Sequence, residues 1–209
     1  MNPVVLKLLL IGVALVIWFW TQKLIGRQAG QTEGIGDAVH RLTARWHQYF
    51  AENEKAADRA LAVSSFFIDV MGITLTAASL FGPSFAPFLA ILIVFGLRQV
   101  CQLCCTLPPP PGMIWRDPGV PSALVTYQVS NDFFFSGHTA LAVLGAVGIC
   151  QFAPWWIGAL AVLIALGEAV IVLVLRAHYT LDVITGALAA WVAMDLAGRL
   201  APAVDMWLK

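Results

Sequence analysis

Long apolar runs dominate this sequence and limit what it can fold into. A helix needs about 20 mostly apolar residues to cross the hydrocarbon core of a bilayer. Six stretches meet this requirement, at residues 3–20, 60–80, 84–104, 136–153, 155–176 and 181–198. Hydrophobic residues make up 60% of the chain and charged residues only 11%, which lies outside the range of soluble domains. The sequence therefore predicts an all-α, polytopic membrane protein with six transmembrane helices in a bundle.

Short connections determine how these runs follow one another. Only a few residues separate the second run from the third and the fourth from the fifth, and Pro83, Pro87 and Pro154 lie in or beside these connections. Such pairs form antiparallel hairpins. Six crossings then put both termini on one side of the membrane. The end of the third run, the start of the fourth, the end of the fifth and the start of the sixth meet on the other side.

The N-terminal part divides into two segments. Residues 1–20 lack a signal-peptide cleavage site and end in aromatic residues, so we expect a retained transmembrane anchor. Residues 21–59 are polar, and their apolar residues recur at helical spacing: Val39, Leu42, Trp46, Tyr49 and Phe50. This pattern predicts an amphipathic helix at the membrane interface, with His40 and His47 on a solvated flank outside the functional site.

The connection at residues 105–135 is rich in proline. Four consecutive prolines, Pro108–Pro111, favour a stiff, extended segment. Such a segment can cover a site at this face as a lid, or it can serve as a plain connector. The sequence leaves both interpretations open.

Charge and cysteine content exclude some functions. The chain has 12 Lys plus Arg and 12 Asp plus Glu, and it lacks a long basic run, which argues against nucleic-acid binding. Cys101 and Cys104 have the spacing of a zinc or redox pair, but no second pair and no nearby histidine completes a site. We therefore expect packed membrane cysteines and no cofactor.

Two short stretches place polar groups at the ends of apolar runs. They are Ser136–Thr139 and Arg176–Asp182, and they contain two of the four histidines. Ionisable groups at such places are costly unless they are paired or functional. The predicted topology brings both stretches, together with Arg98, to one face of the membrane. This convergence predicts one shared site.

The residue types in this site suit a phosphate group. His178 and Asp182 are four residues apart, so a helix places them on one face, where the carboxylate can fix the imidazole tautomer and free the other nitrogen for attack. Ser136-Gly137 at a helix start supplies a hydroxyl, close backbone approach and unpaired N–H groups. Arg98 and Arg176 add donors that match phosphate oxygens.

Two histidines allow a double displacement. His178 attacks phosphorus, and His138 protonates the departing alkoxide and then accepts a proton from the incoming hydroxyl. The reaction then passes through a phosphohistidine. A lipid alcohol as acceptor gives a transferase, whereas water gives a phosphatase. The arginines supply the positive charge that a metal would otherwise provide, so we expect no metal site and metal-independent activity.

The motifs resemble those of a known superfamily. Residues 132–139 (DFFFSGHT) and 178–183 (HYTLDV) are similar to motifs of the type 2 phosphatidic acid phosphatase superfamily, in its sphingomyelin synthase-like branch. Arg98, followed by Thr106-Leu107-Pro108, resembles a third motif. The resemblance implies a catalytic core at residues 60–200, with His178 as nucleophile, Asp182 as its partner and His138 as acid and base. Asp132 and Tyr179, inside the motifs, are secondary candidates.

These observations predict an integral-membrane lipid phosphotransferase that moves a phospholipid headgroup phosphate to a lipid alcohol such as ceramide or diacylglycerol. One alternative is a lipid phosphate phosphatase or phospholipase C-like hydrolase with the same site. Another class is a lipid-binding or transport protein without catalysis, since Asp69, Glu168 and Asp195 lie inside apolar runs. Against transport, the two halves lack matching broken helices. Homo-oligomerisation is left open.

Two arguments about orientation disagree. More Lys and Arg residues flank the predicted catalytic face than the opposite face, which by the positive-inside rule puts that face in the cytoplasm. The family resemblance implies an exoplasmic or periplasmic site with both termini in the cytoplasm. We expect the second orientation.

Overall fold

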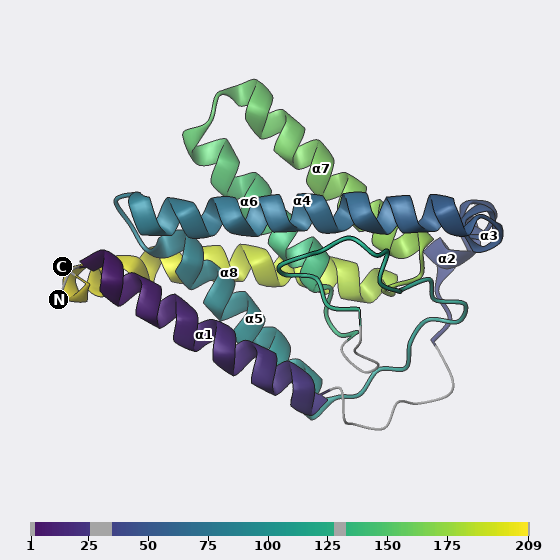
Figure 1. Cartoon of the computed structure of the whole chain (residues 1–209), viewed down its shortest axis with the longest axis horizontal. Coiled ribbons are helices and arrows are strands. Elements are labelled where there is room, and N and C mark those ends of the chain that lie inside the picture. Colours follow the sequence, from purple (N-terminus) through teal and green to yellow (C-terminus); the bar gives the residue numbers. More distant parts are fainter. Residues whose placement is uncertain (1–2, 26–34, 128–132, 209) are drawn as a thin grey trace.

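The computed structural model describes residues 3–25, 35–127 and 133–208, and none of these residues forms a strand. Its helices are α1 (Pro3–Ile25), α2 (Ala38–Leu42), α3 (Ala44–Glu52), α4 (Glu54–Phe81), α5 (Ala86–Cys104), α6 (Gly137–Phe152), α7 (Trp155–Val174) and α8 (Thr180–Trp207). Figure 1 shows both termini at one end of the bundle, with α2 and α3 at the opposite end. The predicted all-α class is confirmed.

Five of the described helices are long and apolar enough to cross a membrane: α1, α4, α5, α7 and α8. They coincide with five of the six predicted runs, as a multi-pass membrane protein requires. The remaining run forms α6, which is apolar but has 16 residues, fewer than the ~20 of a usual crossing. Six crossings therefore stay a prediction.

Small residues allow α6 to pack closely on its neighbours. The helix lies against α4, α7 and α8, while α5 packs on α8. Buried alanines line these contacts, among them Ala140, Ala142, Ala190 and Ala193, each at most 1% exposed. Close backbone approach through small side chains is the usual way in which membrane helices associate.

The two histidine-bearing stretches meet where α6 and α8 begin. The Ser136 N–H donates to the Asp182 carbonyl oxygen over 3.1 Å. A Cβ atom at Gly186 would lie only 2.6 Å from the Ser136 carbonyl oxygen, so the contact requires glycine. The packing of these two helices thus fixes the start of one motif against the start of the other.

The N-terminal polar segment forms two short helices rather than the single predicted amphipathic helix. Thr43 ends α2 and precedes α3. Leu42, Trp46 and Tyr49 are exposed, at 84%, 62% and 56%. An interfacial position for these apolar side chains stays a prediction.

Glycine substitutions in α8 test the contact with α6. We expect Gly186→Ala to destabilise the protein by about 1–3 kcal/mol, because the added methyl group meets backbone that cannot move freely. Gly198→Ala, in the same helix, is the matched control, since its Cβ would meet no atom within 4 Å. Thermal unfolding in detergent measures both variants. Equal loss of stability in the two variants would contradict this account of the packing.

Candidate active site

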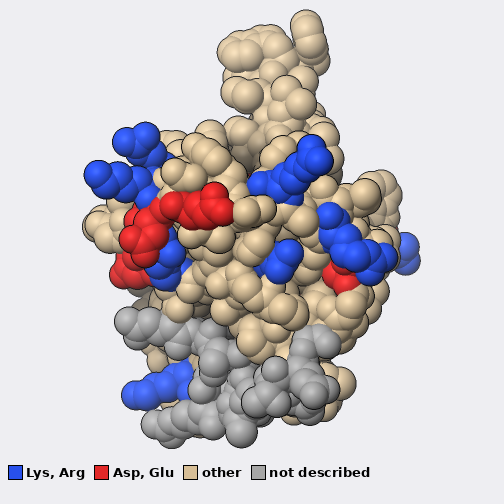
Figure 2. Space-filling model, turned by 90° about the vertical axis from the view of Figure 1, so that its right-hand side faces the viewer, with Lys and Arg blue, Asp and Glu red and all other residues tan. Residues whose placement is uncertain are grey.

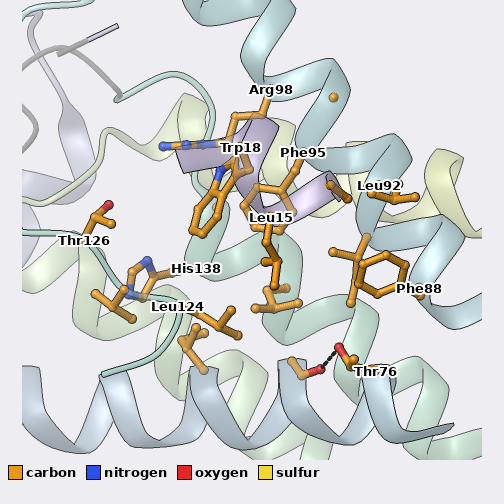
Figure 3. A pocket seen from close by; sticks show the side chains of 18 of the residues that line it. Leu15, Trp18, Thr76, Phe88, Leu92, Phe95, Arg98, Leu124, Thr126 and His138 are labelled. Carbon is orange, nitrogen blue, oxygen red and sulfur yellow. Dashed lines mark hydrogen bonds between the residues drawn. The ribbon is translucent and has the colours of Figure 1, made fainter. Parts of the chain in front are cut away.

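A cavity of about 640 Å³ lies between α1, α4, α5, α6 and the segment at residues 115–126. Most of its lining is apolar. Arg98, Gly137, His138 and His178 line it as well, so the structure brings four of the predicted site residues to one space. Figure 3 shows Arg98 and His138 with the apolar residues of this cavity.

A backbone carbonyl orients the His178 imidazole. Its Nδ1 lies 2.9 Å from the Phe133 carbonyl oxygen, which can only accept, so Nδ1 carries a proton, and in the neutral form of the ring the lone pair is on Nε2. Asp182 Oδ2 is 3.7 Å from Nδ1 and accepts from the Tyr179 N–H instead, at 2.8 Å. The Phe133 carbonyl is thus the hydrogen-bond partner of Nδ1, and a role of Asp182 in fixing the tautomer stays a prediction. The carboxylate is fully buried beside the ring.

His138 lies in the first turn of α6 and presents an unsatisfied nitrogen. Its ring meets the Trp115 ring edge to face, with centroids 5.0 Å apart. The buried Nε2 has no hydrogen-bond partner in the part of the chain that the structure describes. Buried polar atoms in proteins are nearly always paired. Because His138 lines the cavity, a bound molecule can provide that partner.

Arg98 lies against the start of α6. Its Nε donates to the Phe135 carbonyl oxygen over 2.8 Å. A Cβ atom at Gly137 would lie 3.4 Å from this Nε, an ordinary contact distance, so the guanidinium lies directly against the first residue of α6. A cation beside the positive end of a helix dipole favours an anion there.

Three predicted residues lie elsewhere or outside the described chain. Ser136 caps α6, its hydroxyl oxygen accepting from the Thr139 hydroxyl at 3.0 Å, and the Arg176 Nη1 donates to the Pro111 carbonyl oxygen at 2.8 Å. Neither is among the described residues that line the cavity. Asp132 lies outside the described residues. Direct substrate contact by these three side chains stays a prediction.

The chain turns sharply between α7 and α8, at residues 175–179, and His178 lies in this turn, which we call the break. Arg176 adopts the left-handed conformation, with φ of +53°. The Ala177 N–H donates to the Val172 carbonyl at 2.8 Å and the Arg176 N–H to the Leu173 carbonyl at 3.1 Å. These two bonds form a Schellman motif, which ends α7 and turns the chain.

Two histidines of the N-terminal segment hold this break. His40 Nε2 donates to the His178 carbonyl oxygen, and His47 Nδ1 donates to the Val174 carbonyl oxygen, each over 2.9 Å. The predicted solvated flank is therefore wrong, since His40 is 6% and His47 8% exposed. The reason is that the break leaves carbonyl groups without helical partners. Their sequence spacing of seven, two helical turns, was the only signal that both face one surface.

Asp37 joins the starts of α2 and α8. Its carboxylate accepts from the Val39 N–H at 2.8 Å and from the N–H and hydroxyl of Thr180 at 2.6 and 2.8 Å. Burial raises the pKa of Asp37, but the bonds from Thr180 and the proximity of His40 outweigh it and lower the pKa below its ordinary 3.8. The charged carboxylate thus caps both helices at neutral pH. We call Asp37, His40 and His47 the clamp.

Tyr179 belongs to the same region rather than to the cavity lining. Its hydroxyl accepts from the Ile35 N–H at 2.7 Å, and its ring stacks on His40 with centroids 5.7 Å apart. It is not among the described residues that line the cavity. Tyr179, the residue after His178, therefore connects the N-terminal segment to the start of α8.

The proline-rich connection covers the cavity. The Asp69 carboxylate accepts from the Ser122 hydroxyl and from the N–H groups of Ala123 and Leu124, the last two at 2.9 Å. Trp115, Leu124 and Thr126 line the cavity. The structure thus supports a covering role for this segment, and Asp69 anchors it.

The other two acids also have protein partners. The buried Glu168 carboxylate accepts from the Ser64 hydroxyl at 2.5 Å, between α4 and α7. Asp195 pairs with Arg199 at 2.9 Å on the exposed face of α8. Neither lines the cavity among the described residues.

The clamp should make stability depend on pH. Burial lowers the pKa of His47 below its ordinary 6.5, and the charges of Arg176 and His40 lower it further, against the hydrogen bond to Val174. Since the unfolded chain binds the proton first, this stability is complete above about pH 6.5 and is lost as pH falls below it, by at most about 1.4 kcal/mol per pH unit.

His47→Asn tests this assignment, because asparagine can donate to Val174 but cannot titrate. We expect this variant to show a shallower loss of unfolding free energy between pH 7 and pH 5 than wild type, whereas the exposed Gln48→Asn on the same helix should keep the wild-type slope. An unchanged slope in His47→Asn would rule out the assignment.

Comparison with known proteins corrects the family expected from the motifs. The chain matches the AtPDCT1/2 family over residues 36–199, and no curated protein matches. That name stands for phosphatidylcholine:diacylglycerol cholinephosphotransferase, a family different from the type 2 phosphatidic acid phosphatase and sphingomyelin synthase group. Short motifs with histidine, serine, glycine and aspartate reflect phosphate chemistry, so they did not separate the two.

The match covers most of the chain. It begins just before α2 and ends within α8, so it includes the clamp, the four cavity residues named above and the break that carries His178. The family name identifies a transferase of membrane-lipid metabolism. On the extent of this match, the chain belongs to the AtPDCT1/2 family.

Proposed function

We propose that this protein transfers phosphocholine from phosphatidylcholine to diacylglycerol through a phosphohistidine intermediate. One observation carries the chemistry: His178, with its proton on Nδ1, and His138, with an unpaired Nε2, line one apolar cavity beside Arg98. The family match supports the identity of donor and acceptor.

In the first half-reaction, Nε2 of His178 attacks the phosphorus of phosphatidylcholine. The bond from phosphorus to the glycerol oxygen breaks, and His138, which takes up a proton beside the bound anionic phosphate, donates that proton to this oxygen. Diacylglycerol leaves, and phosphocholine stays bound to His178. In the second half-reaction His138 removes the proton from the hydroxyl of a new diacylglycerol. That oxygen attacks phosphorus, and His178 is released.

Several groups support the charges of these steps. Arg98 and the start of α6 at Gly137 favour the negative oxygens on phosphorus. The Asp182 carboxylate, 3.7 Å from Nδ1, favours the positive charge that develops on the His178 ring as it attacks. The Nδ1 bond to Phe133 holds the ring in the attacking orientation.

We propose that the reaction needs no metal ion. The arginine and the helix terminus supply positive charge, and a cation beside them would be repelled. In the described chain, no three His, Cys, Asp or Glu residues lie close enough together to hold a metal. The apolar lining of the cavity favours a lipid alcohol over water as acceptor.

We propose that α6 is the sixth crossing and that the α2–α3 end faces the cytoplasm. The opposite orientation, with the termini in the cytoplasm, was expected from a family resemblance that the match to AtPDCT1/2 overturns. Figure 2 shows Lys and Arg side chains spread over this end, and Arg41, Arg45, Lys55 and Arg59 are exposed there. The C-terminus then lies outside the cytoplasm. A reporter that works only outside the cytoplasm should be active when fused there, and a reporter that works only in the cytoplasm should be inactive. The reverse pattern would overturn the proposal.

A transfer assay tests the proposed reaction. Phosphatidylcholine labelled in its choline and diacylglycerol with different acyl chains should give labelled phosphatidylcholine with the acceptor's chains, with or without a chelator. We expect His178→Ala to lower this rate at least about a thousandfold. Asp182→Asn should also lower it, whereas Asp195→Asn, an exposed acid of the same helix, should not. Wild-type transfer by His178→Ala would refute the proposal.

A further inference from the structure

We infer that the cavity is a single acyl-chain site that donor and acceptor glycerolipids occupy in turn. The glycerol esters would lie beside Trp18 and Gln99, and the acyl chains would lie between α1, α4 and α5. The identity of the lipid rests on the proposed function. The position of its chains follows from the shape and lining of the cavity alone.

The cavity is long enough to hold acyl chains across one membrane leaflet. Along α4 its lining runs from Ile68 to Phe81, and along α5 from Phe88 to Gln99. Thirteen steps along α4 correspond to about 20 Å at 1.5 Å per residue. One leaflet is about 15 Å deep, half of a ~30 Å hydrocarbon core. Chains attached to a headgroup at Arg98 therefore have room to extend to the level of Phe81.

The polarity of the lining changes along this length, as the polarity of a glycerolipid changes from its headgroup to its acyl chains. Arg98, His138 and His178 lie at one end, where a phosphate would react. The remainder is formed largely by apolar side chains such as Leu15, Phe88 and Leu92, which Figure 3 shows around the same space. Apolar cavities with a few polar groups at one place bind ligands of matching polarity.

Two unsatisfied polar atoms lie where ester groups would be. Trp18 Nε1 and Gln99 Oε1 are buried and have no hydrogen-bond partner in the described chain, and both residues line the cavity. Gln99 is adjacent in sequence to Arg98. An ester carbonyl can accept from the Trp18 N–H, and a free hydroxyl can donate to the Gln99 oxygen. Diacylglycerol carries both groups on its glycerol backbone.

Helix α1 forms the wall between this space and the membrane. Residues between Ile11 and Thr21 line the cavity, while Val13, Val16 and Trp20 on the same helix are exposed. Figure 1 shows α1 on the outside of the bundle, next to α5. Because α1 precedes the residues matched to the family, this wall comes from the structure and not from the match.

One cavity is sufficient for both half-reactions. While phosphocholine is bound to His178, the first diacylglycerol has left and the second has not yet reacted. Both molecules have the same glycerol and acyl parts, so the same lining suits each of them. The site therefore holds one glycerolipid at a time.

Gly96→Phe should obstruct the acyl part of the cavity. Gly96 lines the cavity, and its Cβ would meet no atom within 4 Å, so a phenyl group can enter without moving backbone. Gly167→Phe on α7 is the matched control, since its Cβ also meets nothing and it lies outside the described lining. We expect Gly96→Phe to lower kcat/KM for dioleoyl-phosphatidylcholine about tenfold relative to dihexanoyl-phosphatidylcholine. Gly167→Phe should leave this ratio unchanged.

A binding measurement separates this inference from the proposed reaction. Diacylglycerol with a photoreactive group near the end of one acyl chain should label α4 and α5 lining residues, in wild type and in His178→Ala. Gly96→Phe should reduce this labelling and Gly167→Phe should not.

The outcomes are distinct. Labelling inside the cavity without transfer of phosphocholine between any lipids would overturn the proposed function and support the binding site. Transfer by wild type, together with labelling confined to the outer faces of the helices and an unchanged chain-length ratio in Gly96→Phe, would overturn the acyl-chain site.

Discussion

The break between α7 and α8 imposes the constraint on which the rest of the site depends. Buried backbone groups must find hydrogen-bond partners within the protein, because water does not reach them, and Val174 and His178 are both buried. The break frees the carbonyl groups of Val174 and His178 and the N–H of Thr180, and the clamp binds all three. The polar N-terminal segment thus supports the site, although none of the three clamp residues lines the cavity.

The residues that hold the backbone around the site differ from the residues proposed to react. The clamp satisfies the backbone around His178, and the Phe133 carbonyl fixes the ring, which leaves the imidazole edge available to a ligand. His138 differs from His178, because its Nε2 is buried without a hydrogen-bond partner in the described chain. Asp69 holds the segment whose Trp115 ring packs against His138. A hydrogen-bonded surrounding that leaves an unsatisfied nitrogen at the reacting end is what preorganised catalysis requires.

Hydropathy predicted most of the helices, because an apolar run long enough to span a bilayer satisfies its backbone hydrogen bonds best as a helix. The same topology predicted that Arg98, His138 and His178 meet, since each lies at the end of a run. The clamp was missed because His40 bonds to a carbonyl 138 residues away, and no local pattern reveals such a partner. Asp182 lies within ion-pair reach of His178, as the spacing predicted, but its carboxylate accepts from the Tyr179 N–H because His178 precedes α8. The family was misjudged because two short motifs carried the resemblance.

The stereochemical course at phosphorus tests the central claim, transfer through His178, most directly. Phosphatidylcholine made chiral at phosphorus with oxygen-18 should give a phosphatidylcholine product with retained configuration, because two in-line displacements each invert the centre. Inversion would show that the acceptor hydroxyl attacks the donor lipid directly, and it would contradict a phosphohistidine intermediate.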